Sequence, residues 1–202
     1  MTNKKGILFV VSGPSGAGKG TICRAVLEKS DRFSLSVSAT TRLPREGENE
    51  GVHYYFLTRD DFEKRIANNE FIEYNEYCDH LYGTLRSEVD RILSDGKNCI
   101  LEIDVNGGLN VKKVFPEAVL VFVLPPTVEI LKARLIKRGT ETLDVIEKRL
   151  DCVRDEISKA PYYDYLLIND DLDVALQDFE HIHKSLYMSM EKSLDIVETF
   201  SF

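Results

Sequence analysis

The chain has 202 residues, of which 43% are hydrophobic and 30% are charged, and its net charge is -8 at pH 7. These values predict a globular fold around one sizeable core. The negative charge argues against a general nucleic-acid-binding protein, which usually presents a basic face. No apolar run approaches the ~20 residues of a membrane-spanning helix and no signal peptide precedes the first strand pattern, so we expect no membrane partner and a cytoplasmic location.

The cysteines give no sign of a metal centre or a disulfide framework. Cys23, Cys78, Cys99 and Cys152 lie far apart, without a Cys-x-x-Cys pair or a histidine at zinc-ligand spacing nearby. We expect them to be ordinary reduced thiols.

Four short apolar runs are typical of strands buried on both faces of a parallel sheet, and they cover residues 7–11, 99–103, 119–124 and 165–168. Helical patterns alternate with them, at about residues 19–28, 87–93, 128–137, 143–158 and 172–197. This alternation predicts a doubly wound α/β core.

Two segments interrupt the alternation. Residues 36–84 combine closely spaced aromatic residues, a polar turn and one short helix pattern at 60–68, which indicates an inserted subdomain. Around Gly139 two charged helix patterns meet, which predicts a small lid. We expect a single domain over residues 1–202, with a core formed by 1–35, 85–126 and 160–202, an insert at about 36–84 and a lid at about 127–159.

The strongest motif is the glycine-rich segment that follows the first apolar run and opens a helix pattern. Its glycines allow successive backbone N–H groups to point at one anion, while the helix N-terminus and a lysine add positive charge. This context predicts the phosphate-binding loop of a P-loop NTPase-type fold. The residues expected to bind ATP phosphates are Gly13, Pro14, Ser15, Gly16, Ala17, Gly18, Lys19, Gly20 and Thr21.

One position of the loop differs from the common pattern. Gly20 follows the lysine, where a serine or threonine hydroxyl usually ligates Mg²⁺. We therefore expect the ion to be held largely through water molecules.

Several further motifs follow in order along nearly the whole chain. They are Ser38-Ala39-Thr40-Thr41-Arg42-Leu43-Pro44-Arg45, Gly51-Val52-His53-Tyr54-Tyr55-Phe56, Phe71-Ile72-Glu73, Tyr82-Gly83-Thr84, Leu101-Glu102-Ile103-Asp104, Pro125-Pro126, residues 134–140, Lys148-Arg149 and Asn169-Asp170-Asp171. This series resembles the motifs of the guanylate kinase family. The resemblance implies an ATP-binding core, an inserted GMP-binding subdomain, a mobile lid, and Mg²⁺-dependent phosphoryl transfer from ATP to GMP or dGMP.

Within this resemblance, Glu73 is the expected reader of guanine. A carboxylate can accept hydrogen bonds from both N1–H and the exocyclic amine of guanine, whereas adenine has no donor at N1. Ser38 and Thr84 would donate hydroxyl hydrogen bonds to O6. Asp104 would either assist at the guanine amine or order a metal-bound water molecule.

Arginines are expected at the phosphates. Arg42 and Arg45 carry planar guanidinium groups that suit a doubly charged monophosphate, and the resemblance adds the hydroxyls of Tyr54 and Tyr82. A second arginine pair, Arg138 and Arg149, falls in the predicted lid.

Phosphoryl transfer needs no general base here, because the attacking oxygen of GMP is already ionised near neutral pH. Lys19, Arg138 and Arg149 are the expected catalytic residues, which stabilise charge on the transferred group, and Arg134 is an accessory contact. The resemblance implies a position for Asn169 near the adenine of ATP, although Asn-Asp-Asp after a strand is also typical of a turn. No direct metal ligand is predicted, and Glu102 and Asp104 are candidates for contacts through water.

Two other functions remain open at this point. Another nucleoside monophosphate kinase, such as one for adenylate, has a similar loop, but Glu73 favours guanine. A non-catalytic interaction module of the same fold would not need Lys19 or the arginines. The oligomeric state, monomer or homo-oligomer, is left open.

Overall fold

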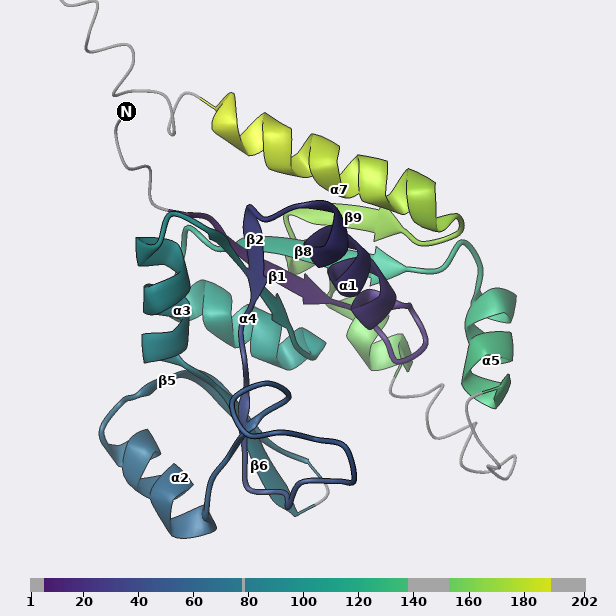
Figure 1. Ribbon diagram of the computed structural model, residues 1–202. Coiled ribbons are helices and arrows are strands. Elements are labelled where there is room, and N and C mark those ends of the chain that lie inside the picture. Colours follow the sequence, from purple (N-terminus) through teal and green to yellow (C-terminus); the bar gives the residue numbers. More distant parts are fainter. Residues whose placement is uncertain (1–5, 78, 138–152, 190–202) are drawn as a thin grey trace, which may run out of the picture.

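The computed structural model describes residues 6–77, 79–137 and 153–189, and within them lie two β-sheets (Figure 1). The larger sheet has five parallel strands in the order β2-β7-β1-β8-β9. The four predicted strands are confirmed, and a short fifth strand, β2, is added at one edge. The strands are β1 (Leu8–Ser12), β2 (Phe33–Leu35), β7 (Asn98–Glu102), β8 (Val119–Leu124) and β9 (Tyr165–Ile168).

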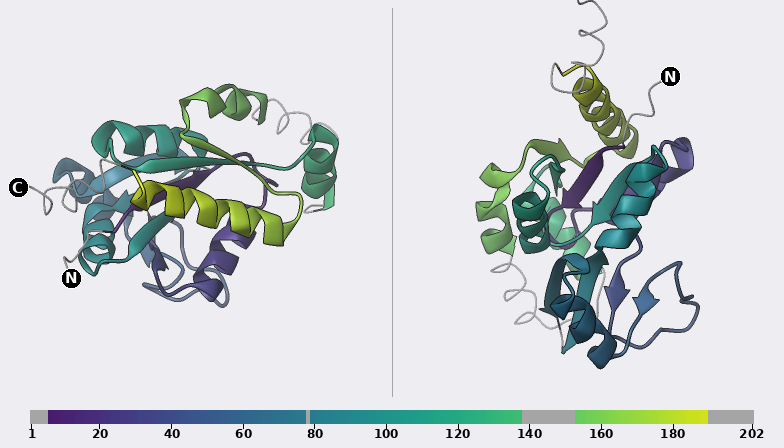
Figure 2. Two further views of the ribbon diagram at one scale, coloured as in Figure 1. Left: turned by 90° about the horizontal axis from the view of Figure 1, so that it is seen from above. Right: turned by 90° about the vertical axis from the view of Figure 1, so that its left-hand side faces the viewer.

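Helices cover both faces of this sheet, as the views in Figure 2 show. Helices α1 (Lys19–Lys29) and α7 (Leu172–Tyr187) pack on one face, and α3 (Arg86–Ser94) and α4 (Val105–Val114) pack on the other. Successive side chains of a strand point to opposite faces. Both faces of β1 are accordingly buried, and the predicted doubly wound α/β fold is confirmed.

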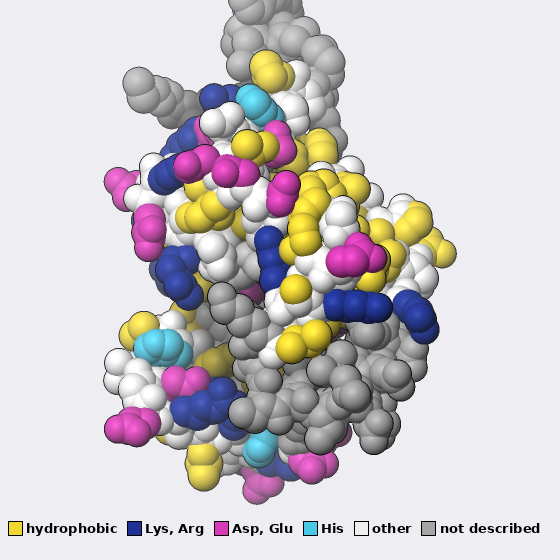
Figure 3. Space-filling view, turned by 90° about the vertical axis from the view of Figure 1, so that its right-hand side faces the viewer, with side chains coloured by type: hydrophobic (Ala, Val, Ile, Leu, Met, Phe, Trp, Pro, Cys, Tyr) yellow, Lys and Arg dark blue, Asp and Glu magenta, His cyan; other side chains and the backbone are white. Residues whose placement is uncertain are grey.

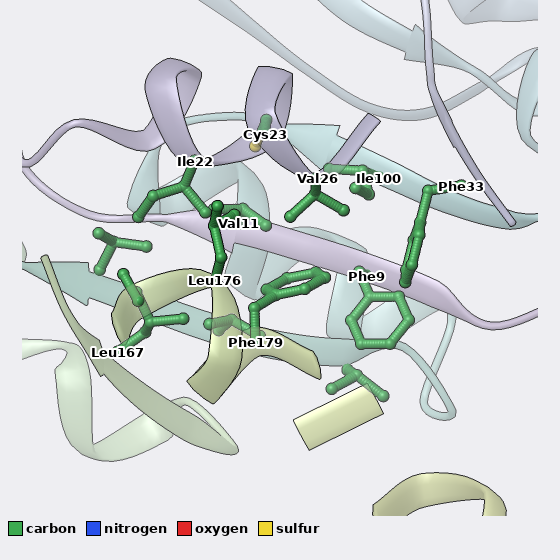
Figure 4. Close-up of a cluster of buried hydrophobic side chains, with 14 of the residues drawn as sticks. Phe9, Val11, Ile22, Cys23, Val26, Phe33, Ile100, Leu167, Leu176 and Phe179 are labelled. Atoms are coloured by element: carbon green, nitrogen blue, oxygen red, sulfur yellow. The ribbon is translucent and has the colours of Figure 1, made fainter. Parts of the chain in front are cut away.

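The aromatic side chains of the first face anchor α1 to the sheet. The ring of Phe9 lies 5.9 Å from that of Phe33 and 5.4 Å from that of Phe179, measured between ring centroids (Figure 4). Ile22 and Val26 of α1 join the same buried cluster. Packing of large apolar side chains contributes roughly 1.5–3 kcal/mol each, so the start of α1 is held firmly beside the end of β1.

A second sheet forms most of the segment between β2 and α3. Its strands follow the order β4-β3-β6-β5, and their bounds are β3 (Ala39–Thr40), β4 (Tyr55–Phe56), β5 (Phe71–Tyr77) and β6 (His80–Leu85). Helix α2 (Arg59–Ala67) starts at the N-cap Thr58 and buries Phe62 against the sheet. Leu81 is buried in the same cluster and so belongs to the core of this small sheet.

The topology creates a crevice at the carboxyl ends of β1 and β7. The chain leaves these adjacent strands into helices on opposite faces, α1 after β1 and α4 after β7. Ligands of open α/β sheets bind at such a switch point. The carboxyl end of the sheet thus brings the loop at residues 13–18 close to Glu102 and Asp104.

Three helical elements differ from the sequence patterns. Helix α4 is not indicated by them, because the adjacent glycines Gly107 and Gly108 lower helix propensity. Helix α7 ends at Tyr187 instead of continuing toward residue 197, and residues 190–197 lie outside the described part. Of the predicted helix at 143–158, residues 153–158 are helical and the remainder lies outside the described residues.

Two further elements lie between β8 and β9 in the chain. Helix α5 (Val128–Lys137) follows β8, and the 3₁₀ helix η1 (Ala160–Tyr162) precedes β9. Across the ranges that the structure describes, no helix has both the length and the apolar character to cross a bilayer.

Candidate active site

The glycine-rich loop joins β1 to α1 with a backbone that only glycine adopts easily. Gly13, Gly16 and Gly18 have φ angles of 145°, 88° and 92°. Gly18 is the N-cap of α1, so the first helical N–H groups face the loop. The Lys19 ammonium donates hydrogen bonds to the carbonyl oxygens of Gly13 at 2.6 Å and Pro14 at 3.3 Å. The loop is therefore closed around its own lysine, at the positive end of a helix.

Asn169 and Arg134 hold this loop from the far side. The Asn169 side-chain amide donates to the Ala17 carbonyl at 2.8 Å, and the Arg134 guanidinium donates to the Asn169 carbonyl at 3.1 Å. A Cβ at Gly18 would lie only 2.1 Å from the Asn169 amide nitrogen, so the close approach requires glycine. Both predicted residues thus lie at the loop, where they bind its backbone.

A cavity of about 550 Å³ opens beside this contact. That volume lies within the range of small-molecule sites. It is lined by Gly16, Gly18, Thr21, Arg134, Asn169, Asp170 and Leu172. Figure 3 shows this side of the molecule, with Lys and Arg side chains on both the core and the smaller sheet.

Glu73 forms a buried carboxylate on the small sheet. It pairs with Thr84 of the neighbouring strand, and the Thr84 hydroxyl donates to its Oε1 at 2.7 Å. A Cβ at Gly107 would lie 3.1 Å from Oε2, so the start of α4 approaches the carboxylate closely. Burial, followed by the charge of Asp104, raises the pKa of Glu73 to about 7 against the opposing hydrogen bond from Thr84. The structure therefore brings Glu73, Thr84 and Asp104 together.

Asp104 links the small sheet to the crevice of the large one. Its Oδ1 accepts a hydrogen bond from the Gly107 amide at 2.9 Å and caps α4, and its Oδ2 lies 3.5 Å from the Asn75 amide nitrogen. The Ser12 hydroxyl donates to the Asp104 carbonyl at 3.2 Å. Asn75 was not predicted, although its position two residues after Glu73 on the same strand face could have indicated it.

Arg42 lies among aromatic rings in the small subdomain. Its guanidinium carbon lies 5.4 Å from the centre of the Tyr54 ring, and the Tyr54 and Tyr82 rings are 6.1 Å apart. These three predicted residues thus form one cluster. Ser38 lies just before β3, and its carbonyl accepts a hydrogen bond from the Tyr55 amide at 2.9 Å.

Glu48 orders the arginine cluster and was missed by the sequence analysis. Its Oε1 accepts from the Arg42 guanidinium at 2.9 Å, and its Oε2 accepts from the Arg45 backbone amide at 2.8 Å. The hydrogen bond with Arg42, then that with Arg45, lowers the pKa of Glu48 to about 2. The Arg45 side chain itself is exposed. The sequence signal that could have indicated Glu48 is its position three residues after Arg45.

Glu102 ends β7 beside the start of α1. A Cβ at Gly20 would lie 3.1 and 3.3 Å from the two carboxylate oxygens of Glu102. Among the described residues, no group of three or more His, Cys, Asp and Glu side chains is arranged to hold a metal ion. The predicted catalytic residues Arg138 and Arg149 lie outside the described residues.

Comparison with known proteins identifies the family. The family model described as guanylate kinase matches residues 5–186. The guanylate kinase of Carboxydothermus hydrogenoformans is 50% identical over 178 residues, which cover 88% of this chain and 87% of that protein. That of Clostridioides difficile is 48% identical over 182 residues, which cover 90% and 89%.

A solved structure agrees with these sequence matches. The guanylate kinase from Anaplasma phagocytophilum superposes with a TM-score of 0.73 at 29% identity, and the match covers 92% of this chain and 88% of that one. The range matched by the family model includes the phosphate-binding loop, the inserted sheet and β9. This chain belongs to the guanylate kinase family.

Proposed function

We propose that this protein transfers the γ-phosphoryl group of ATP to GMP or dGMP and releases ADP and GDP or dGDP. The observation that carries the proposal is the buried Glu73 carboxylate, which accepts a hydrogen bond from the Thr84 hydroxyl at 2.7 Å, in a chain that also has a phosphate-binding loop. An ionised carboxylate matches the two adjacent donors of guanine, and the Thr84 hydroxyl would donate to O6 by turning from Glu73 to the nucleotide. Names and identities of the relatives support this reaction, and neither alternative gains support from them.

The proposed division of labour follows the architecture. The loop at residues 13–21 and the cavity beside Asn169 hold ATP. The insert at about residues 36–84 binds GMP, with Glu73, Thr84, Ser38 and Asp104 at the base. Arg42, Arg45, Tyr54 and Tyr82 bind the monophosphate, and a lid at about residues 127–159 closes over both.

Within this arrangement, Arg42 is well prepared to bind a phosphate. Glu48 holds one side of its guanidinium, and the ring of Tyr54 supports its face. A fixed guanidinium loses little conformational freedom on binding, and its planar fork suits phosphate oxygens. The GMP phosphate can thus be oriented before ATP arrives.

Transfer then depends on orientation and charge. The attacking GMP oxygen is already ionised, so the protein has no proton to remove. The Lys19 ammonium, which donates to the Gly13 carbonyl of the loop, would also donate to the phosphates of ATP, and Arg138 and Arg149 are proposed to stabilise the transferred group. Closure over both nucleotides would exclude water as a competing acceptor.

Mg²⁺ is the proposed cofactor. When bound with ATP, it neutralises charge on the β- and γ-phosphates. The donor chemistry beside the loop fits this ion, because the Glu102 carboxylate is an oxygen donor that lies next to Gly20. Asp104 is a second oxygen donor at the same sheet edge.

We place this reaction in the cytoplasm. The thiols of Cys23 and Cys99 are buried and not joined in disulfides, which suits a reducing compartment. ATP and a guanine monophosphate are the proposed partners, and the net charge of -8 gives no support for a nucleic-acid partner.

A coupled assay that supplies ATP with GMP, dGMP, IMP or AMP tests the proposal. GMP should be the best acceptor, and IMP, which lacks the exocyclic amine, should be poorer by about 10-fold or more. Glu73→Gln should lower kcat/KM for GMP by on the order of 100-fold, since a charged hydrogen-bond acceptor is lost. Glu76→Gln is the matched control on the same strand, where the carboxylate is exposed. AMP turnover equal to that of GMP would overturn the guanine assignment.

A further inference from the structure

Asn75 lies on the same face of the small sheet as residues proposed to bind GMP. In the register of β5 and β6, Glu73 pairs with Thr84. The next pair on that face is Asn75 with Tyr82. Because alternate residues of a strand share one face, the two pairs form adjacent rows, about 7 Å apart. The first row belongs to the proposed guanine site and Tyr82 to the proposed monophosphate site, so Asn75 lies beside the part of the nucleotide between them.

Helix α2 covers the opposite face of these strands. Leu81 packs there with Phe62 of the helix. Glu76 forms an ion pair with Arg59 of the same helix at 3.2 Å. Neighbouring residues of a strand point to opposite faces, so the Asn75 side chain points away from α2, and it is exposed. The core of the small sheet therefore does not explain the amide at this position.

The carboxylate of Asp104 faces the Asn75 amide from the start of α4. Asn75 Nδ2 lies 3.5 Å from Asp104 Oδ2, and Asp104 Oδ1 accepts a hydrogen bond from the Gly107 amide at 2.9 Å. An ionised carboxylate only accepts, so the amide turns one N–H toward it and has a second N–H for another partner. The two side chains thus present an acceptor and a donor next to each other.

Guanine carries the complementary groups on one edge. Its exocyclic amine is a donor and the ring nitrogen N3 beside it is an acceptor, and asparagine side chains read this edge in the minor groove of DNA. Thr84 lies at Oε1 of Glu73, and the start of α4 approaches Oε2. With O6 on the Thr84 side, the amine and N3 fall on the α4 side, where Asp104 and Asn75 lie.

We propose that Asn75 is a specificity residue for the acceptor nucleotide, which donates its second N–H to N3 of guanine while its first N–H holds the Asp104 carboxylate for the exocyclic amine. The inference rests on the proposed phosphorylation of GMP and adds to it a residue that reads the N3 position. Adenine also has N3 but has no amine beside it, so discrimination against AMP stays with Glu73 and Asp104.

A cycle of two proteins and two substrates tests the contact. The proteins are the wild type and Asn75→Ala, and the substrates are GMP and 3-deaza-GMP, in which a C–H group replaces N3. Initial rates at saturating ATP give kcat/KM for each pair. Calorimetric titration of each acceptor without ATP gives its affinity, so that binding is separated from transfer.

The wild type should use 3-deaza-GMP less well than GMP by on the order of 10-fold, because the N–H of Asn75 then faces a C–H group. Asn75→Ala should lower kcat/KM for GMP by a similar factor and should treat the two substrates alike within about twofold, so the two changes are strongly non-additive. The preference for GMP over IMP should also shrink, since Asp104 is less well held. The ratio of GMP to dGMP should stay at the wild-type value, because the contact is with the base.

Asn68→Ala is the matched control, since Asn68 is exposed in the same subdomain and its amide also donates to a carboxylate, that of Glu70, at 3.2 Å. Its ratio of GMP to 3-deaza-GMP should equal that of the wild type. An Asn75→Ala variant that keeps the wild-type ratio would overturn the inference, and so would one that changes only the ratio of GMP to dGMP, which would assign Asn75 to the sugar. If the wild type does not phosphorylate GMP at all, the proposed function fails first.

A wild type that phosphorylates GMP but uses 3-deaza-GMP equally well would count against the role of Asn75 alone. The two failures are therefore distinguishable in one set of rates.

Discussion

The Asn169 side-chain amide lies 2.8 Å from the carbonyl oxygen of Ala17, so the turn after the last strand of the large sheet holds the middle of the phosphate-binding loop. The two residues are 152 positions apart in the chain. Asn169 is buried, and its own carbonyl accepts a hydrogen bond from Arg134. The loop conformation thus depends on a contact made by the end of β9.

Replacing Asn169 with alanine should therefore weaken ATP binding without changing GMP binding. The substitution removes the donor at 2.8 Å and leaves the buried Ala17 carbonyl with only the longer contact from the Arg134 guanidinium at 3.5 Å, at a cost of about 1–3 kcal/mol. We expect KM for ATP to rise by on the order of 10-fold. Initial rates at varied ATP and at varied GMP separate the two effects.

Asn110→Ala is the matched control, since Asn110 is exposed and accepts only a surface hydrogen bond from Lys113. Equal increases in KM for both nucleotides in Asn169→Ala would contradict a local effect on the loop and would point to general loosening of the fold.

Binding of GMP should depend on the ionisation of Glu73. Its pKa is raised to about 7, chiefly by burial, and only the ionised carboxylate can accept both guanine hydrogen bonds. KM for GMP should therefore rise by roughly 10-fold for each pH unit below about 7, while KM for ATP follows a flatter profile. Steady-state rates between pH 5.5 and 8.5 measure this, and a GMP profile without a break near neutrality would contradict it.

The same shift predicts a linked effect on stability. Because the folded-state pKa of Glu73 lies above the ordinary value of 4.5, folding favours the protonated form. This contribution is full below about pH 4.5 and is lost as the pH rises through about 7. Glu73→Gln, which stays neutral, should therefore gain Tm relative to the wild type as the pH is raised from 5 to 8.

Glu48 should act as a positioning residue for the proposed monophosphate site. Glu48→Gln removes the charge that holds the Arg42 guanidinium and weakens the contact with the Arg45 amide. Without its ionic partner the Arg42 guanidinium is less well oriented for phosphate, so KM for GMP should rise by on the order of 10-fold, with KM for ATP unchanged. Since the pKa of Glu48 is lowered to about 2, the effect should be the same at every pH from 5 to 8.

Glu46→Gln provides the comparison for this variant, because Glu46 is an exposed carboxylate two residues earlier in the same loop. If both substitutions raise KM for GMP equally, the cause is the loss of negative charge in the loop and not the specific contact between Glu48 and Arg42.

Sequence patterns predict those parts of this molecule whose structure is determined by neighbouring residues in the chain. The apolar runs before Ser12 and Asp104 leave little choice but buried strands, and the glycine spacing after Ser12 permits only a tight loop. The family motifs predicted Glu73 and Arg42. Helix α4 was not predicted, because its glycines have low helix propensity. Gly107 and Gly108 fit their long-range contacts, with Glu73 and with Tyr163.

The sequence analysis did not predict Glu48 and Asn75, for a related reason. A carboxylate in a polar loop and an amide on a strand are usually solvated, and only the folded chain brings them to Arg42 and Asp104. Pairings of this kind depend on tertiary geometry, which a single sequence does not display.

The buried His183 should make the fold sensitive to mild acid. Asn98 Oδ1 accepts from the Ile7 amide at 2.9 Å and from the Tyr187 hydroxyl at 3.1 Å, so its amide nitrogen faces His183 Nε2 at 2.9 Å. His183 Nε2 must therefore accept the hydrogen bond from Asn98, so the ring proton lies on Nδ1, 3.6 Å from the Glu180 carboxylate. If Nε2 were protonated, its N–H would face the N–H of the Asn98 amide, and neither could accept.

Burial, and then the charge of Arg32, lowers the pKa of His183, and Lys184 acts in the same direction against Glu180. A depressed folded-state pKa means that the stabilising contribution is complete above the ordinary pKa of histidine, 6.5, and is lost as the pH falls below it. Between pH 7 and pH 5 the wild type should therefore lose unfolding free energy through this group. His183→Gln should be less stable at pH 7 but show a smaller loss.

Urea unfolding at pH 7, 6 and 5 measures the difference between the two slopes. His181→Gln is the matched control, because His181 lies on the same helix with its side chain 73% exposed, and its slope should equal that of the wild type. A His183→Gln variant that loses stability as steeply as the wild type would assign the acid sensitivity to other groups. If the unfolding free energy depends less on pH in His183→Gln and in no other variant, the contact between Asn98 of β7 and His183 of α7 is the acid-sensitive one.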